Sequence, residues 1–228
     1  MHIVMNDSFC DAHKVQHTAV LLTACARPFP RKGFTRQYTQ SLRLRLHYYA
    51  RTILSYLNNT ELPILVIESS GYRFNISHKR LRQHTFNMAH QLPTSTQQEA
   101  TSILRALDAG LLEGFHKIIK VTGKYYLPDL EKAIKVIPVD ACIIYQYTHV
   151  RERSKWLRRR AWQNSEIFGF CSSFIRPIFG PIARSMSGAM EHALLNVHLA
   201  LNTSSYRLPA LRIMHKVRRG DSSVLAIL

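Results

Sequence analysis

Acidic residues are scarce in this sequence. Its 228 residues include 31 Lys and Arg against 14 Asp and Glu, which gives a formal net charge of +17 at pH 7. A chain with this charge favours polyanionic partners, namely phosphates, nucleic acids or acidic lipid headgroups. Charge alone does not choose among these three classes.

Several motifs that carry familiar chemistry are absent. The sequence contains no GxGxxG after its first apolar run, and no GxxxxGK[ST], GxSxG or HExxH. Dinucleotide oxidoreduction, P-loop hydrolysis, serine-hydrolase chemistry and zincin proteolysis therefore lack their signature residues. No set of His, Cys and acidic residues has zinc-like spacing. The four cysteines form no CxxC pair and three lie in apolar runs, which a reducing compartment or plain burial explains.

Long apolar segments are missing as well. No run approaches the roughly 18 to 20 residues needed to span a bilayer, and the N-terminus lacks the apolar stretch of a secretory signal. We therefore expect a cytoplasmic protein, with peripheral contact to an anionic membrane as an additional expectation. The run "RERSKWLRRRAW" (151–162) interleaves Trp with cations and suits a membrane surface, an acidic acceptor or nucleic acid. Its default interpretation is a solvated helix face.

The sequence does contain alternating apolar strands and amphipathic helices. Residues 1–16 are polar and without period, so we predict a loose extension followed by one domain, with a nucleotide-binding half (17–137) and an acceptor half with a basic tail (138–228). Strands are predicted at 17–28, 62–71, 115–121, 140–147 and 165–171, and helices at 35–57, 94–114, 128–136, 172–184 and 188–201. This order predicts an α/β fold with a mostly parallel sheet and helices on both faces.

Two of the predicted helices have recognisable sequence features. The helix at 35–57 should bury one apolar face, formed by Leu42, Leu46, Tyr49, Ile53 and Tyr56. In the helix at 94–114, Thr94 or Ser95 is suited to cap the start and Gly114 to close the end.

Polar and charged residues follow the first three main strands. In open α/β sheets, ligands bind beyond the carboxyl ends of the strands, so these residues form the predicted site. A carboxylate there suits a base or ribose, and cations suit phosphate oxygens, which together fit a nucleotide diphosphate. The residues concerned are Arg27, Glu68, Ser69, Thr122, Gly123 and Lys124.

The order "AVLLTACARP", helix, "LPILVIESSG", helix near "QQEATSIL", then "IIKVTGKYYLPDLEKAI" resembles a GT-A-type glycosyltransferase over residues 17–200. In that family an acidic DxD motif ends the third main strand and holds a divalent metal on the sugar-nucleotide diphosphate. Here Thr122, Gly123 and Lys124 stand in its place. The resemblance therefore implies a metal-independent enzyme in which Lys124 stabilises the departing diphosphate, with no cofactor besides the nucleotide sugar.

The resemblance also implies roles for further residues. An inverting enzyme needs a carboxylate to deprotonate the acceptor hydroxyl, and either Glu191 or Glu166 is suited to this. A retaining enzyme needs no such base. The basic tail is expected to fold back over the diphosphate through Lys216, Arg218 and Arg219, while Glu68 and Arg27 contact the nucleotide. Turn, capping and solvated roles are the structural alternatives for these residues.

The sequence thus favours a glycosyltransferase that moves a sugar from a nucleotide diphosphate to a hydroxyl on a glycan or lipid-linked acceptor, in polysaccharide or glycoconjugate biosynthesis. Two other classes stay open. The net charge is compatible with a nucleic-acid-binding protein, although no recognition motif for nucleic acid is present. The missing acidic triplet is compatible with a degenerate transferase fold that only binds its ligand.

Overall fold

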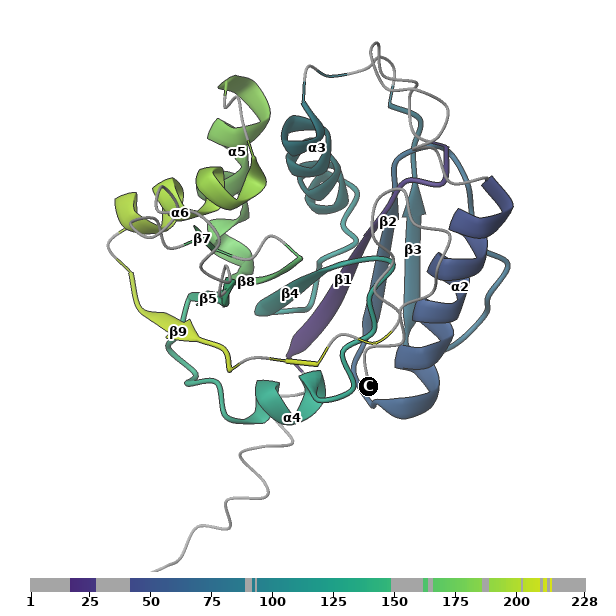
Figure 1. Cartoon of the computed structure of the whole chain (residues 1–228), viewed down its shortest axis with the longest axis horizontal. Helices are drawn as coiled ribbons and strands as arrows, with labels where there is room; N and C mark the ends of the chain where they lie inside the picture. The colour runs from purple at the N-terminus through teal and green to yellow at the C-terminus, as the bar shows by residue number, and fades with distance from the viewer. Residues whose placement is uncertain are drawn as a thin grey trace, which may run out of the picture.

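The fold is built on one twisted sheet with helices on both sides (Figure 1). The computed structural model describes residues 17–27, 42–88, 92, 94–148, 162–163, 166–185, 189–201, 203–209, 211–212 and 214. Among these residues, none of the helices combines the length and the apolar character that crossing a bilayer requires.

Seven strands form the main sheet, in the order β3-β2-β1-β4-β8-β5-β9. Their bounds are β1 Thr18–Ala24, β2 Ile64–Glu68, β3 Leu81–Thr85, β4 Lys117–Thr122, β5 Ile143–Tyr145, β8 Ile167–Cys171 and β9 Ser205–Arg207. Neighbouring strands are parallel except where β8 pairs with β4 and β5. A separate antiparallel pair joins β6 (Tyr147–Thr148) to β7 (Trp162–Gln163). The fold class predicted from the sequence is confirmed.

The helices divide between the two faces of the sheet. Their bounds are α2 Leu42–Asn59, α3 Ser95–Asp108, α4 Leu130–Lys135, the 3-10 helix η3 Ser172–Phe174, α5 Ile175–Ser185 and α6 Met190–Ala200. Helices α2 and α4 pack on one face, and α3, α5 and α6 pack on the other. Each face therefore has its own hydrophobic core.

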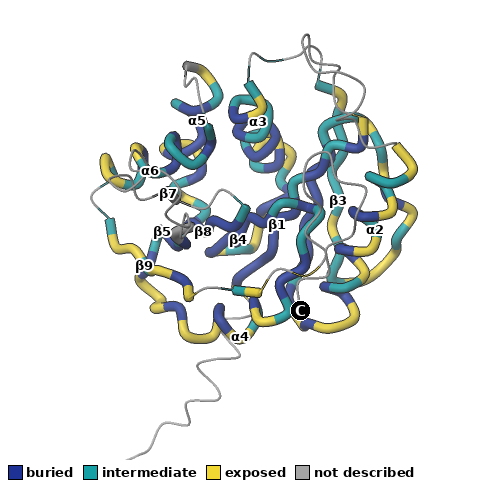
Figure 2. Tube along the Cα trace, viewed as in Figure 1, coloured by how far each residue is buried: buried dark blue, intermediate teal, exposed yellow. Residues whose placement is uncertain are grey.

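Strand β1 is apolar along its length because both of its faces are covered. Val20 and Leu22 point into the core beneath α2, whereas Ala19 and Leu21 point into the core beneath α3. Such continuous apolar runs are typical of parallel strands buried on both sides. Figure 2 shows the central strands as the buried interior, with exposed residues concentrated on the outer helices and loops.

Some predicted boundaries differ from the structure. The helix predicted at 35–57 is found as α2 from Leu42, while residues 28–41 lie outside the described residues. Leu42 itself is 38% exposed, because the buried face of α2 begins one to two turns later. Thr94 caps α3 as predicted and accepts the Gln97 N–H at 3.1 Å. The helix ends at Asp108 and the chain turns at Gly110 (φ 69°), so Gly114 (φ 86°) belongs to the following turn and does not close the helix.

Two strands of the main sheet were not predicted. Strand β3, with the sequence LRQHT, lies at one edge of the sheet and is only partly buried, and β9 lies at the other edge. Neither has the apolar run that identified the central strands, because an edge strand keeps part of its surface in water. Their addition widens the sheet and leaves β2, β1 and β4 adjacent at its centre.

Candidate functional site

The register of the sheet brings the predicted residues to one edge. Ala24 pairs with Glu68 and Thr23 with Thr122, so β1, β2 and β4 end at nearly the same level. The antiparallel strand β8 begins at this level, and the Thr122 N–H donates to the Glu166 carbonyl oxygen at 2.9 Å. Arg27, Glu68, Ser69, Thr122, Gly123, Lys124 and Glu166 are therefore at or next to a common edge.

Glu68 is completely buried and fixes the loops on either side of it. Its Oε1 accepts from the Ala26 N–H at 2.8 Å and the Ser70 hydroxyl at 2.5 Å, and its Oε2 accepts from the N–H groups of Ser70 at 2.9 Å and Tyr72 at 2.7 Å. A buried carboxylate is tolerated when its oxygens are hydrogen-bonded in this way. Glu68 thus joins the segment after β1 to the turn after β2. Its contact with a nucleoside stays a prediction.

Ser69 and Arg27 extend the same loops toward the surface. The Ser69 N–H donates to the Ala24 carbonyl oxygen at 3.1 Å, and its hydroxyl donates to the same oxygen at 3.3 Å. The Arg27 N–H donates to the Ser70 hydroxyl at 3.0 Å, while the Arg27 residue is exposed. The guanidinium is therefore carried on a loop whose backbone is held by Ser70 and Glu68.

Gly123 is required by a close approach of two backbones. Its N–H donates to the Thr23 carbonyl oxygen at 3.0 Å. A Cβ at position 123 would lie 2.6 Å from that oxygen and 3.1 Å from a ring carbon of Tyr49, which are both too short for ordinary contacts. The glycine therefore lets β4 turn tightly against β1 and places Lys124 immediately beyond the sheet.

Two cations converge on the ring of Tyr49. The Lys124 Nζ lies 5.6 Å from the ring centroid and the Arg45 Cζ lies 5.9 Å from it, both within the range of cation–π attraction. Arg45 also donates to the Cys25 carbonyl oxygen, at 3.1 Å from Nε and 2.5 Å from Nη2. The Cys25 N–H in turn donates to the Tyr49 hydroxyl at 3.2 Å. We call Arg45, Tyr49 and Lys124 the cation cluster.

The Tyr49 hydroxyl of the cluster and the neighbouring Cys25 thiol are held in their neutral forms. Burial raises the pKa of the Cys25 thiol, against the opposing effects of a hydrogen bond with Ser69 and of the cations Arg45 and Lys124. Burial likewise raises the pKa of the Tyr49 hydroxyl. Both groups therefore stay protonated near neutral pH, and the cluster presents a net positive charge suited to an anion.

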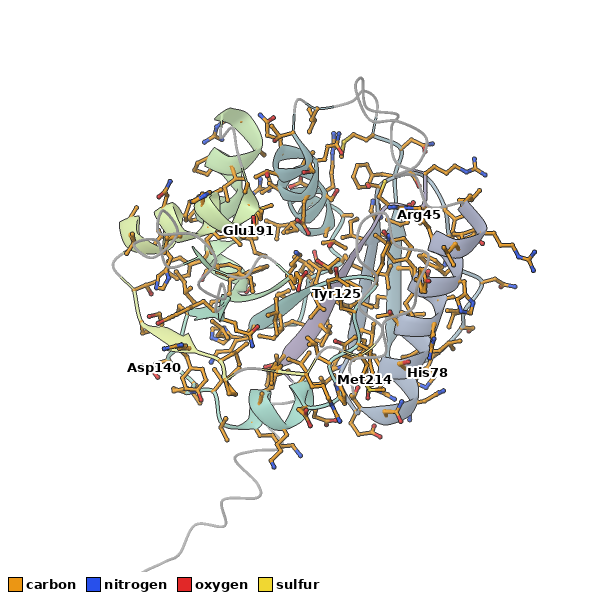
Figure 3. All side chains as sticks on the ribbon, viewed as in Figure 1. Arg45, His78, Tyr125, Asp140, Glu191 and Met214 are labelled. Atoms are coloured by element: carbon orange, nitrogen blue, oxygen red, sulfur yellow. The ribbon has the colours of Figure 1, made fainter. Side chains whose placement is uncertain are left out.

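Sequence reasoning missed Arg45 and Tyr49 as functional residues. They lie on α2, four residues apart, and so share one face of the helix. Figure 3 shows Arg45 near the beginning of α2. The spacing was visible in the sequence, but α2 carries two other arginines, and only its packing decides which of them reaches the end of β1.

A second polar group lies on the opposite face of the sheet. Glu99 of α3 accepts from the Thr23 hydroxyl at 2.9 Å and forms an ion pair with Lys120 at 2.6 Å. The Lys120 side chain is 4% exposed. A lysine within an apolar strand buried on both faces needs a nearby carboxylate, and this signal was available in the sequence. The pair fixes α3 against β1 and β4 at the level of the site.

The two predicted bases occupy different places. Glu166 is half-buried and directly precedes β8, beside Thr122. Glu191 is half-buried in the first turn of α6. Figure 3 shows Glu191 on the side of the molecule away from Arg45, with Tyr125 between them in this view. The geometry brings Glu166 to the strand edge and does not choose between the two carboxylates as base.

The C-terminal segment returns to the turn that carries Lys124. The Met214 N–H donates to the Tyr126 carbonyl oxygen at 2.8 Å, and the Tyr126 N–H donates to the Met214 carbonyl oxygen at 3.4 Å. The predicted phosphate-binding residues of the tail, Lys216, Arg218 and Arg219, lie outside the described residues. Of the Trp- and Arg-rich run at 151–162, only Trp162 in β7 is described.

Among the described residues, the end of β4 offers no carboxylate to a divalent metal. Hard divalent cations prefer several carboxylate oxygens, whereas the end of β4 presents Thr122, Gly123 and Lys124. Within the described residues, no three His, Cys, Asp or Glu side chains converge as metal ligands. The nearby carboxylate of Glu68 is already engaged by four donors.

Comparisons with known proteins give structural resemblance but no match of sequence. No model of a known protein family matches the chain, and no curated protein matches it either. Among solved structures, the chain is similar to a glycosyltransferase involved in the glycosylation of the major capsid of PBCV-1, with a TM-score of 0.49 and 5% sequence identity. The match covers 83% of this chain and 80% of that chain. A likeness at this level does not transfer an activity, so the site is interpreted from its own geometry.

Proposed function

We propose that this chain is a glycosyltransferase that moves a sugar from a nucleotide diphosphate to a hydroxyl acceptor without a bound metal. The observation that supports this most directly is the cation cluster at the carboxyl ends of β1 and β4. When the bond between the sugar and the phosphate breaks, negative charge develops on the leaving diphosphate. Fixed cations stabilise that charge most effectively where water is partly excluded.

The cation cluster holds the diphosphate in this proposal. Lys124 meets the phosphate oxygens, with Arg45 beside it and the hydroxyl of Thr122 as a further donor. Gly123 serves the reaction by allowing the tight turn that sets the position of Lys124. Glu68 holds the loop that carries Arg27, and so orders the part of the site that faces the nucleoside.

The acceptor side and the tail complete the proposed site. Glu166 or Glu191 removes the proton from the acceptor hydroxyl in an inverting reaction. Lys216 follows Met214 by two residues in the sequence. The bridge between Met214 and Tyr126 therefore supports the proposal that Lys216, Arg218 and Arg219 add positive charge near Lys124.

Donor binding is the direct test of this function. UDP- and GDP-sugars at millimolar concentration, each with and without EDTA, should be screened for their effect on the thermal midpoint. A ligand at 100 times its Kd adds about 2.7 kcal/mol, which raises the Tm of a domain of this size by roughly 5 to 10 °C. We expect one nucleotide class to give this shift, equally in EDTA. If no nucleotide sugar changes the Tm, the donor site does not exist.

A matched pair of lysine variants tests the assignment of Lys124. Lys124→Ala should lower the rate of sugar transfer or donor hydrolysis by about 10² to 10³-fold, which is the loss typical when one stabilising group is removed. Lys132→Ala removes the same charge from an exposed position on α4 and should leave the rate unchanged. Equal rates for the two variants would contradict the role of Lys124. Donor binding without any turnover would instead support a non-catalytic binding module.

The net charge of +17 also supports a different function, nucleic-acid binding. That function predicts affinity for generic DNA or RNA whose logarithm falls linearly and steeply with the logarithm of the salt concentration. Fluorescence anisotropy with a labelled oligonucleotide between low and physiological salt measures this slope. Saturable binding at physiological salt, together with the absence of any nucleotide-sugar effect, would favour it over the transferase.

A further inference from the structure

Two thiols meet at the end of the sheet opposite the cation cluster. Cys142 directly precedes β5 and Cys171 ends β8, and their Sγ atoms are 3.1 Å apart. Cys171 pairs with Lys117, the first residue of β4, whereas the cluster lies beyond Thr122, the last. Lys117 and Thr122 are five residue steps apart along β4, which corresponds to about 17 Å. The thiols are therefore not part of the proposed transferase site.

The strand register suits a covalent bond between these thiols. Strands β5 and β8 are antiparallel and pair Ile143 with Phe170, which puts Cys142 directly opposite Cys171. The Cys171 N–H donates to the Cys142 carbonyl oxygen at 2.9 Å. Opposite residues in an antiparallel pair have Cα atoms roughly 4.5 to 5.5 Å apart, within the range of roughly 4.4 to 6.8 Å that disulfides use. A bond can form without separating the strands.

The two thiols differ in access, and the pKa of the Cys171 thiol is raised. Cys171 is 1% exposed, and burial together with the adjacent Cys142 raises the pKa of its thiol to about 12, against the opposing charge of Lys117. Cys142 is half-buried. His116 is exposed, and its Nε2 lies 3.7 Å from the Cys171 Sγ. An external reagent therefore reaches Cys142 first, and an imidazole is in place to receive the proton of Cys171.

We propose that Cys142 and Cys171 form a reversible disulfide by exchange with a low-molecular-weight disulfide such as oxidised glutathione. The Cys142 thiolate attacks one sulfur of that disulfide, which gives a mixed disulfide and releases one small thiolate. Cys171 then gives its proton to His116, and its sulfur attacks the Cys142 sulfur and displaces the second small thiolate. The protein loses two electrons and two protons, and the oxidant is reduced to two thiols.

The disulfide closes a loop that contains the predicted acceptor side. Residues 143 to 170 lie between the two cysteines and include Glu166 and β7. Closing a loop of this length restricts the unfolded chain more than the folded one. The oxidised protein should therefore melt at a temperature about 10 °C higher than the reduced protein. This inference does not depend on the proposed transferase activity.

Peptide mapping tests the crosslink in the intact native chain. Incubation with excess oxidised glutathione should consume two of the four thiols, link the tryptic peptides of Cys142 and Cys171, and raise the Tm. Subsequent incubation with reduced glutathione should reverse all three changes. Cys25→Ser should form the same link, whereas Cys142→Ser and Cys171→Ser should form no such link. Absence of the linked peptide at equilibrium, or its formation only in denaturant, would overturn the proposal.

A histidine variant tests the resolving step. His116→Gln should slow the displacement by about tenfold or more, because proton acceptance by a positioned imidazole contributes at least this much. The mixed disulfide of Cys142 with glutathione should then accumulate and be visible as an intact-mass adduct. A merely structural role for His116 would alter stability without producing this adduct. Unchanged closure kinetics would contradict the assignment of His116.

Discussion

The substitution Glu68→Gln separates a positioning role for this residue from direct nucleoside recognition. The glutamine has one acceptor oxygen, so its amide nitrogen must face either the Ala26 N–H or the N–H groups of Ser70 and Tyr72. In the milder arrangement the Ser70 hydroxyl rotates to accept from the amide, and only the Ala26 N–H loses its acceptor. That loss costs about 1 to 3 kcal/mol, and each remaining bond weakens by about 1 kcal/mol when the acceptor is neutral.

The summed effect is a loss of about 4 kcal/mol in the free energy of unfolding, or roughly 10 °C in Tm. Urea denaturation at constant m-value and calorimetry measure these quantities. The control is Glu61→Gln, the same change on a side chain that is 84% exposed, which should alter stability by less than about 0.5 kcal/mol. If Glu68→Gln has the same Tm as the unmodified protein and only its affinity for the donor falls, the carboxylate contacts the nucleoside directly. The positioning role is then refuted.

Three further substitutions test the packing around the site. Gly123→Ala should cost about 1 to 3 kcal/mol, because its Cβ would press on the Thr23 carbonyl oxygen, and an unchanged urea midpoint would contradict this. Glu99→Ala removes the carboxylate that pairs with the buried Lys120 and should lower the free energy of unfolding by about 3 kcal/mol. The double variant with Lys120→Met should recover part of this lost free energy in the same urea assay. Among the described residues, the Nδ1 of His198 has no hydrogen-bond partner, and burial lowers the pKa of this histidine. The unfolded chain therefore binds more protons below about pH 6.5, and stability falls as the pH drops. His198→Phe should therefore show a smaller fall in Tm between about pH 7.5 and about pH 5.5, and an equal fall would exclude His198 as the source.

The central part of the fold could be predicted because its physical signals are local. Strands β1, β2 and β4 are covered on both faces, which requires the continuous apolar runs seen in the sequence. Strand β3 gave no such signal, since Arg82 and His84 at a partly exposed edge look like loop residues. The exposure of Leu42 also could not be read from periodicity, because the packing of α2 on the sheet decides where its buried face begins.

Only those residues of the candidate site that directly follow a strand could be predicted from the sequence. Thr122, Gly123 and Lys124 follow β4 directly, so parallel-strand topology was sufficient to place them at the edge. Arg45 reaches the same edge from a helix, and its contribution depends on how that helix packs. The hydrogen bonds of Glu68 could not be predicted for another reason. Backbone N–H groups of three separate residues donate to its carboxylate, and backbone donors have no sequence signature.

The outer strands of the sheet have a consequence for self-association. An edge strand exposes backbone groups that can pair with a second copy, which is a common route to aggregation. Strand β3 carries Arg82, whose guanidinium lies 5.1 Å from the Phe115 ring centroid and donates to the Glu113 carbonyl oxygen at 3.0 Å. The opposite edge is a three-residue strand that ends at Arg207. Two molecules approaching through either edge would bring like charges together, so repulsion protects the sheet from growing into a polymer.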